Sequence, residues 1–209
     1  VFLAFDPSDL DHLAAPVVFD MDGDGKTAVP LAESQVQFDM SGDGVAERTS
    51  WVDQGDAFLA LDRNEDGLIN DISEISFIGD KEGARTDLEG LTAFDSDDDG
   101  KLTASDDRYV AFKLWFDNNQ NGITDAGELF SLAELGILEV DLHGVPADRP
   151  PRDPGENIVY NLTTFTRDDG TIRHIDSGTV NAYLREVGKG EFTAKHFRTW
   201  GGSVIALAA

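Results

Sequence analysis

The segment DNNQNGITDAGE, residues 117–128, carries the most specific pattern in the chain. Oxygen-bearing side chains stand at its positions 1, 3 and 5, and a glycine follows at position 6. Asp125 at position 9 and Glu128 at position 12 complete the spacing with which a twelve-residue loop surrounds Ca²⁺. Alternate residues of such a loop point inward, because the glycine takes a turn that a side chain would obstruct.

The same hexad occurs five times, which makes the repeat the main feature of the sequence. The copies are DMDGDG from Asp20, DMSGDG from Asp39, DRNEDG from Asp62, DSDDDG from Asp95 and DNNQNG from Asp117. Position 7 supplies a backbone carbonyl in each copy. The candidate metal ligands are Asp20, Asp22, Asp24 and Lys26; Asp39, Ser41, Asp43 and Val45; Asp62, Asn64, Asp66, Leu68, Asn70 and Glu74; Asp95, Asp97, Asp99, Lys101 and Asp106; and Asp117, Asn119, Asn121, Ile123, Asp125 and Glu128.

The copies differ in the carboxylate that ends the loop. Glu128 and Asp106 stand at position 12, whereas Glu74 stands at position 13, so we expect that loop to be one residue looser. Leucine and serine occupy position 12 of the first two copies. We expect those two loops to complete their coordination with water, with a distant carboxylate such as Glu33 or Asp53, or by sharing.

A single Asp-Gly run is often only a solvated turn. Five copies with one spacing argue against that alternative, because independent turns have no reason to share it. Oxygen ligands without His or Cys favour a hard ion, and loops of this size favour Ca²⁺ over Mg²⁺, which demands stricter octahedral geometry. We therefore predict three to five calcium ions.

Composition narrows the class of protein. The 209 residues carry 41 Asp and Glu against 16 Lys and Arg, which gives a net charge of −25 and disfavours binding to a phosphate backbone. There are no cysteines, so disulfides and thiolate sites are excluded. We find no apolar run of about 18 residues that would span a membrane. Val1–Leu10 lacks a signal-peptide pattern, and the missing initiator Met suggests a piece of a larger protein.

Apolar periodicity predicts an α+β fold, with EF-hand-like calcium loops, short helices and a few short strands. The helical spacings are 56–61, 88–94, 105–116 and 126–135, and the strand-like runs are 17–19, 36–38 and 137–142. Residues 158–166 and 171–175 flank the turn Arg167-Asp168-Asp169-Gly170 and predict a β-hairpin.

The runs PVVFDMDGDG, GDAFLALDRNEDGLIND, LTAFDSDDDGKLTASD and LWFDNNQNGITDAGELFSLAELGI resemble the calcium-binding module of bacterial RTX-type secreted proteins, most of all the self-processing module of FrpC-like proteins. The resemblance covers about residues 16–173. It implies Ca²⁺-driven folding outside the cell and, in processing members, scission of an Asp-Pro bond before the first loop by attack of the aspartate carboxylate. Here Ala15 precedes Pro16, so we expect no cleavage there. Asp6-Pro7 is the remaining, weaker candidate.

Residues 174–209 resemble part of the catalytic domain of type IB DNA topoisomerases, especially FTAKHFRTWGGSVIA. The resemblance places a phosphate-contacting arginine at Arg198. The chain stops before the family's nucleophilic tyrosine motif, so we expect no topoisomerase activity.

The predicted organisation has five parts: an N-terminal extension (1–15), a calcium-binding module with five Asp-rich loops (16–143), a Pro-rich loop (144–156), a β-hairpin that completes the module (157–175) and a topoisomerase-IB-like segment (176–209). The predicted function is that of a calcium-folded structural module, secreted or at the bacterial cell surface, with the remainder of a larger protein as its partner. Calcium-dependent Asp-Pro self-processing is the alternative, and DNA binding by the C-terminal segment is a third possibility.

Overall fold

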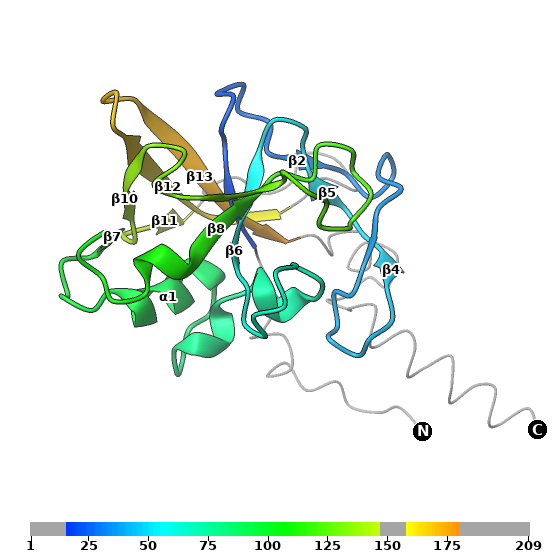
Figure 1. Cartoon of the computed structure of the whole chain (residues 1–209), viewed down its shortest axis with the longest axis horizontal. Helices are drawn as coiled ribbons and strands as arrows, with labels where there is room; N and C mark the ends of the chain where they lie inside the picture. Colours follow the sequence, from blue (N-terminus) through cyan, green and yellow to red (C-terminus); the bar gives the residue numbers. More distant parts are fainter. Residues whose placement is uncertain (1–15, 147–157, 180–209) are drawn as a thin grey trace, which may run out of the picture.

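One antiparallel sheet dominates the part of the chain that the structure, a computed structural model, describes, namely residues 16–146 and 158–179. Its strand order is β7-β10-β12-β13-β1-β6-β8-β9, with β11 paired to β12 (Figure 1). The strands of this sheet are β1 (Val17–Phe19), β6 (Ala57–Leu61), β7 (Lys101–Thr103), β8 (Phe112–Trp115), β9 (Leu129–Ser131), β10 (Ile137–Asp141), β11 (Val145–Pro146), β12 (Ile158–Arg167) and β13 (Ile172–Thr179).

Two pairs of very short strands lie outside the main sheet. In the first pair, β2 (Ala28–Val29) is antiparallel to β5 (Trp51–Val52). In the second, β3 (Gln37–Phe38) is antiparallel to β4 (Glu47–Arg48). The described helices are equally short: α1 (Asp87–Leu91) and the 3₁₀ turns η2 (Ile72–Glu74), η3 (Ile78–Asp80), η4 (Thr92–Phe94) and η5 (Tyr109–Ala111). The Thr86 side chain caps α1 by accepting a hydrogen bond from the Glu89 amide.

The central strands carry apolar side chains on both faces of the sheet. In β6, Ala57, Leu59 and Leu61 belong to one core, while Phe58 and Ala60 belong to a second core. The first core also contains residues from α1, from the β12–β13 hairpin and Phe77, which directly precedes η3. The second core also contains residues from the segment 36–75. The sheet is therefore covered on both sides, in part by the segments that carry the Asp-rich loops.

This double burial overturns the α+β prediction, since the described fold is mostly β. Residues 57–61 form the central strand β6 and not a helix, because every residue of the run is buried. An uninterrupted apolar run satisfies a helical period and a doubly buried strand equally well. Segment 105–116 ends in strand β8, and segment 126–135 contains strand β9. Of the four predicted helices, 88–94 is helical as α1 and η4, and 105–116 contains only the 3₁₀ turn η5 before β8.

The strand predictions agree better with the structure. β1 and β10 lie where expected, β3 covers two of the three predicted residues, and the predicted hairpin exists as β12 and β13. β13 continues to Thr179, where its long ladder with β12 ends.

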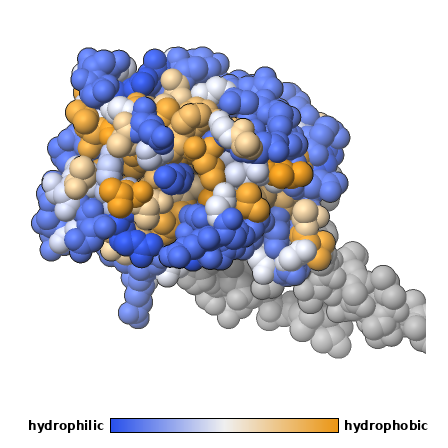
Figure 2. Space-filling view, in the orientation of Figure 1, coloured by the Kyte–Doolittle hydropathy of each residue, from blue (hydrophilic) through white to orange (hydrophobic). Residues whose placement is uncertain are grey.

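The surface reflects the composition. Figure 2 shows hydrophobic residues gathered in the middle of one face, with hydrophilic residues surrounding them. Within the described ranges, no helix combines the length and the apolar character needed to cross a membrane.

Candidate metal centre

The five Asp-rich segments are all loops that follow an element of regular structure. Loops 1, 3 and 5 (residues 20–31, 62–74 and 117–128) follow β1, β6 and β8, whereas loop 2 (39–50) follows β3 and loop 4 (95–106) follows η4. Because β6 runs antiparallel to both β1 and β8, loops 1 and 5 leave the sheet at the end where β6 begins.

All five loops share one backbone conformation. Position 4 has a positive φ in every loop, including the non-glycine residues Glu65, Asp98 and Gln120 at φ 59°, 57° and 52°. The glycine at position 6 also has a positive φ in every loop. Left-handed non-glycine residues are uncommon and cost free energy, so the shared conformation indicates that the loop geometry is imposed by the hexad as a whole.

The carboxylate at position 1 organises the loop from inside. In loop 1, Asp20 accepts the amide of Gly23, at position 4, at 2.6 Å. In loops 2 to 5, one oxygen of the first carboxylate accepts the amide of position 5 and the other accepts the glycine amide of position 6. The donors and distances are Asp43 and Gly44 to Asp39 (3.2 and 2.6 Å), Asp66 and Gly67 to Asp62 (3.2 and 2.8 Å), Asp99 and Gly100 to Asp95 (3.1 and 2.8 Å), and Asn121 and Gly122 to Asp117 (3.1 and 2.7 Å).

A second, buried carboxylate ends loops 3, 4 and 5, and we call it the closing carboxylate. It accepts amides from positions 2 and 9: Glu74 from Arg63 and Asn70 (3.1 and 2.9 Å), Asp106 from Ser96 and Thr103 (both 2.7 Å), and Glu128 from Asp125 (3.0 Å). Glu74 at position 13 and Asp106 at position 12 therefore make equivalent contacts despite their different spacing. All three are at most 8% exposed.

Loop 1 has a closing carboxylate that the sequence reasoning missed. The amide of Met21, at position 2, donates a 2.8 Å hydrogen bond to Asp56, which precedes β6. The pairing of Phe19 with Ala57 explains this contact, because it places the residue after β1 opposite the residue before β6. Neither candidate named from the sequence does this: Asp53 pairs with Lys26 at 2.8 Å, and Glu33 is exposed. Only the strand register could have identified Asp56.

Loop 2 is held differently. Its buried Asp39 also accepts the Ser41 amide at 3.3 Å, and its backbone carbonyl accepts the Ile72 amide at 3.0 Å, which ties the loop to η2. Ser50, at position 12, is buried.

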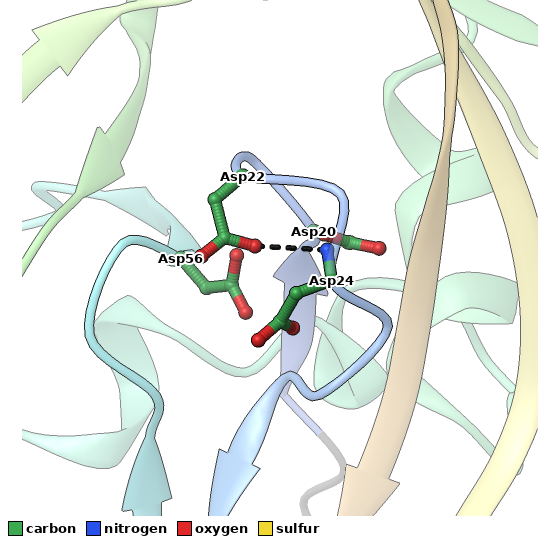
Figure 3. Close-up of side chains that lie close together, drawn as sticks. All are labelled: Asp20, Asp22, Asp24 and Asp56. Carbon is green, nitrogen blue, oxygen red and sulfur yellow. Dashed lines mark hydrogen bonds between the residues drawn. The ribbon is translucent and has the colours of Figure 1, made fainter.

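Carboxylates converge most closely in two loops. One ligand oxygen from each of Asp20, Asp22, Asp24 and Asp56 lies within 4.8 Å of the others (Figure 3), and so do those of Asp95, Asp97 and Asp99. In loops 3 and 5, amide side chains share the inner positions: Asn64 donates to Asp66 at 3.0 Å, and Asn119 donates to Asp125 at 2.8 Å.

Most of the remaining candidate ligands are exposed. Lys26, Val45, Leu68 and Ile123 at position 7 are largely open to solvent, and Lys101 is half-buried and pairs with Glu139 at 2.8 Å. Asn70, Asn121 and Asp43 are exposed, and Ser41 is half-buried. Each loop therefore presents a buried first carboxylate or a half-buried one, with exposed oxygen groups above it.

The negative charges within these loops repel one another. Burial raises the pKa of Asp56 to about 7, the Met21 amide opposes that rise, and the charges of Asp22 and Asp20 add to it. Burial likewise raises the pKa of Glu74, against the amides of Asn70 and Arg63. The loops thus hold carboxylates close together, where a bound cation would neutralise their negative charge.

Loop 5 is attached to the second core by two tryptophans. The indole nitrogen of Trp51 donates to Asp117 at 2.7 Å, and that of Trp115 donates to Glu128 at 3.4 Å. The hydroxyl of Thr124 accepts the Ile69 amide and donates to the Ile69 carbonyl, both at 2.9 Å, which joins loop 5 to loop 3.

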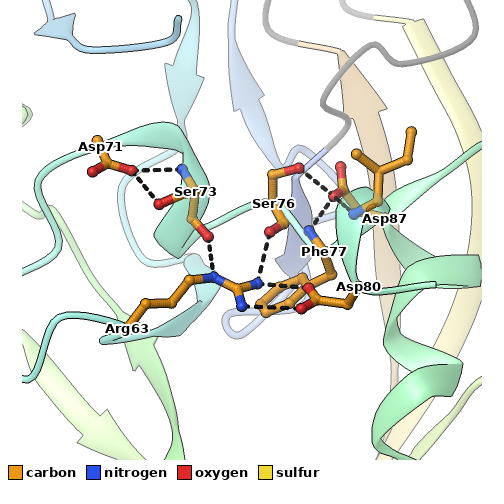
Figure 4. A network of polar contacts seen from close by, with 8 residues as sticks. Arg63, Asp71, Ser73, Ser76, Phe77, Asp80 and Asp87 are labelled. Atoms are coloured by element: carbon orange, nitrogen blue, oxygen red, sulfur yellow. Dashed lines mark hydrogen bonds and ion pairs between the residues drawn. The ribbon is translucent and has the colours of Figure 1, made fainter. Parts of the chain in front are cut away.

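Loop 3 is also fixed to the helical region. Arg63 donates two hydrogen bonds to Asp80, at 2.6 and 3.0 Å, and further bonds to the carbonyls of Ser73 and Ser76 (Figure 4). Asp87, at the start of α1, accepts a 2.6 Å hydrogen bond from the Ser76 hydroxyl. It also accepts the backbone amides of Phe77 and Ile78. This network holds the end of loop 3 against α1.

Four residues singled out in the sequence lie outside the described residues. These are Asp6, Pro7, Ala15 and Arg198.

Comparison with known proteins places this architecture in a family. Residues 17–180, from β1 to just beyond β13, match the SPM domain, and the chain belongs to the SPM domain family. It is also 30% identical over 192 residues to the "Iron-regulated protein FrpA" of Neisseria meningitidis serogroup C. The match covers 88% of this chain but 17% of that protein. The predicted relation to the FrpC-like module is thus confirmed, as is that to a larger RTX-type protein.

A second match concerns the C-terminal part. Residues 154–209 match the catalytic core of eukaryotic DNA topoisomerase I. This match begins 20 residues earlier than the resemblance noted in the sequence and overlaps the SPM domain match. The described part of the overlap forms the β12–β13 hairpin, which is integral to the main sheet through β1 and β10.

Proposed function

We propose that this chain is a calcium-binding module of a secreted, RTX-type bacterial protein, and that three to five bound ions stabilise its fold. The observation that carries the proposal is the repeated hydrogen-bonding scheme of the loops. A first carboxylate and a buried closing carboxylate fix the backbone so that exposed oxygen groups at positions 3 and 5 stand above them. Such an arrangement offers one ion several oxygen ligands at once.

The chemistry of the ligands favours Ca²⁺. The loops offer carboxylate, amide, hydroxyl and carbonyl oxygens, which suit hard cations. Their ligand number and their mixture of Asp, Asn and Ser suit the larger, more flexible shell of Ca²⁺ better than the octahedron of Mg²⁺. Extracellular modules bind calcium at roughly 10⁻⁴ to 10⁻³ M.

Electrostatics supports a role in folding. The chain has a net charge of −25, and the closing carboxylates Asp56 and Glu74 are each 1% exposed. Each bound ion would add two positive charges where repulsion is strongest, and would join residues that are distant in the unfolded chain. Metal binding would then contribute directly to the free energy of folding.

The biological setting is part of the proposal. The relative FrpA is about six times longer than the matched part, so we infer that this module acts within a longer secreted or cell-surface protein. The proposal includes no self-cleavage at the start of β1, because Ala15 supplies no carboxylate before Pro16.

A calcium titration tests the proposal. Chelator-treated protein should bind Ca²⁺ in a calorimetric titration, and circular dichroism should show a gain of β structure and a higher melting temperature. Asp106→Asn should lose one ion, because Asp106 closes loop 4. Asp107→Asn is the matched control, since Asp107 is the adjacent, exposed carboxylate. Equal thermal stability with chelator and with millimolar calcium would contradict the proposal.

The topoisomerase match favours a second candidate function, which is DNA contact through the C-terminal segment. Residues 174–209 carry four Lys and Arg against three Asp and Glu, unlike the acidic remainder. We expect a salt-sensitive mobility shift with duplex DNA that is weakened in Arg198→Ala. Absence of a shift at low salt would remove this candidate.

A further inference from the structure

Loop 1 differs from loops 3, 4 and 5 because its closing carboxylate belongs to another segment. Asp56 lies 36 positions after Asp20, in the turn that leads into β6. The antiparallel pairing of Phe19 with Ala57 brings the two residues together. Gly55 takes the turn before Asp56 at φ 94°, which favours glycine, and a Cβ there would lie 3.0 Å from a carboxylate oxygen of Asp22.

One oxygen of Asp56 is buried without a hydrogen-bond partner. The residue is 1% exposed, and although Oδ1 accepts the Met21 amide at 2.8 Å, Oδ2 has no donor among the described residues. Figure 3 shows the Asp56 carboxylate pointing toward Asp22 and Asp24. A buried, unpartnered carboxylate oxygen is costly unless a ligand satisfies it.

No side-chain cation in the described part of the chain fills this role. Lys26, which lies on the same loop, is paired with Asp53 and not with the four clustered carboxylates. The guanidinium of Arg173 packs against Gly23, where a Cβ would lie 2.0 Å from it, but no ion pair joins it to the cluster. Within the described chain, no ion pair therefore joins a Lys, Arg or His side chain to the four clustered carboxylates.

We propose that Asp20, Asp22, Asp24 and Asp56 hold one divalent cation, and that this ion joins the end of β1 to the start of β6. The inference rests on the proposed calcium binding and adds to it a ligand from outside the loop. Asp20 and Asp56 are the buried ligands, and Asp22 and Asp24 close over the ion from the exposed side. All ligands are carboxylate oxygens within 4.8 Å of one another, which suits Ca²⁺.

The ligand that directly precedes β6, Asp56, gives this site a property that loops 3 to 5 lack. Their closing carboxylates lie 11 or 12 positions from the first ligand, so those loops can form locally. The loop 1 site exists only when β1 is paired with β6. Its ion therefore stabilises the central strand pair of the sheet, and the strand pairing in turn creates the site.

Calcium titration of the full-length protein tests the inference. Asp56→Asn keeps the acceptor for the Met21 amide but removes the charge, so the variant should bind one Ca²⁺ fewer than the wild-type protein. Asp53→Asn, three positions earlier and paired with Lys26, is the matched control and should bind the wild-type number of ions. Asp22→Ala removes the ligand on the exposed side of the same site and should also lose one ion. The double variant Asp22→Ala/Asp56→Asn should lose one ion in total, because both residues serve one site.

Thermal unfolding adds a readout that a purely structural role would not produce. In chelator, Asp56→Asn should melt at the wild-type temperature or above it, because the variant removes a buried charge from a repulsive cluster. In saturating calcium it should melt below the wild-type protein.

The outcomes separate the two proposals. A wild-type protein that binds no calcium would overturn both. A wild-type protein that binds calcium, together with an unchanged ion count in Asp56→Asn and Asp22→Ala, would overturn only the loop 1 site. Should Asp56→Asn fail to fold, the exposed Asp22→Ala variant still decides.

Discussion

At the scale of single residues, the closing carboxylates determine the shape of the loops. Glu74 and Asp106 each hold the amides at positions 2 and 9 of their loop. These bonds hold the loop backbone in the conformation that presents positions 3 and 5. A glutamate at position 13 and an aspartate at position 12 reach the same donors, because the longer side chain compensates for the looser loop.

Asp176 on β13 gives a prediction about pH. Burial raises its pKa above the ordinary 3.8, although the Thr27 hydroxyl opposes this with a 2.5 Å hydrogen bond. A raised pKa in the folded state means that stability is retained below pH 3.8 and is lost as the pH rises through the folded-state pKa. We therefore expect Asp176→Asn to be more stable than the wild-type protein at pH 7 in chelator, as measured by urea unfolding.

The difference should shrink as the pH falls well below 3.8, where the carboxyl group is protonated in both states. Asp169→Asn, on the exposed turn between β12 and β13, is the control and should not show the gain at pH 7, because interactions with Thr171 lower the pKa of Asp169. An Asp176→Asn variant with the same stability deficit at every pH would show that the carboxylate itself is structurally required.

At the scale of secondary-structure elements, β6 shows why local periodicity was insufficient. The run Ala57–Leu61 has an apolar residue at every position, so its sequence fits a helix and a strand. The structure places it at the centre of the sheet, where Phe58 packs edge-on to Trp51 with ring centroids 5.0 Å apart. Burial on both faces, which depends on distant segments, selects the strand.

The short helix α1 provides a second prediction. Replacing glycine by alanine within a helix normally adds stability, but a Cβ on Gly90 would lie 1.9 Å from the Phe77 carbonyl oxygen. We expect Gly90→Ala to lower the free energy of unfolding by about 2 kcal/mol, in the range typical of overpacked cores. Urea unfolding in saturating calcium is the measurement.

Gly79→Ala in η3 is the matched control, because a Cβ there has no neighbour within 4 Å. A Gly90→Ala variant as stable as Gly79→Ala would mean that α1 and η3 can move apart without cost.

The loops were the part of the site that the sequence predicted best. The 1-3-5-6 spacing located all five loops, and the shared positive φ at positions 4 and 6 shows that one local pattern produces one local structure. Asp56 was missed because it lies 36 residues from Asp20 and carries no sign of its role. Strand register alone brings it to loop 1.

At the scale of the whole molecule, the described residues form two cores on opposite faces of one sheet. Loops 2, 3 and 5 are attached to the second core, where Val36, Ile69, Trp51 and Trp115 are buried. Repulsion within an acidic chain opposes burial of this apolar surface, and cations bound at the loops, as proposed, would reduce that repulsion. Calcium would thus affect the packing of the whole domain.

The start of the domain gives a third prediction. The resemblance to the FrpC-like self-processing module implies that an aspartate before Pro16 would attack its own peptide carbonyl. We expect Ala15→Asp to undergo calcium-dependent cleavage between residues 15 and 16, observed as two fragments by mass spectrometry. The unaltered chain should remain intact under the same conditions.

Ala14→Asp is the control, since its carboxylate does not precede the proline. Cleavage of the unaltered chain at this bond would contradict the assigned role of the carboxylate. An intact Ala15→Asp protein that binds calcium would show that this chain lacks other groups required for the reaction.

By itself, the sequence determined the local features of this protein: five loops of one geometry, the acidic charge and the β12–β13 hairpin, because each depends on residues close together in the chain. The tertiary structure decided which apolar runs became strands, since burial on two faces is a property of the assembled sheet. It also decided which carboxylate completes loop 1, because the pairing of β1 with β6 places Asp56 beside Asp20.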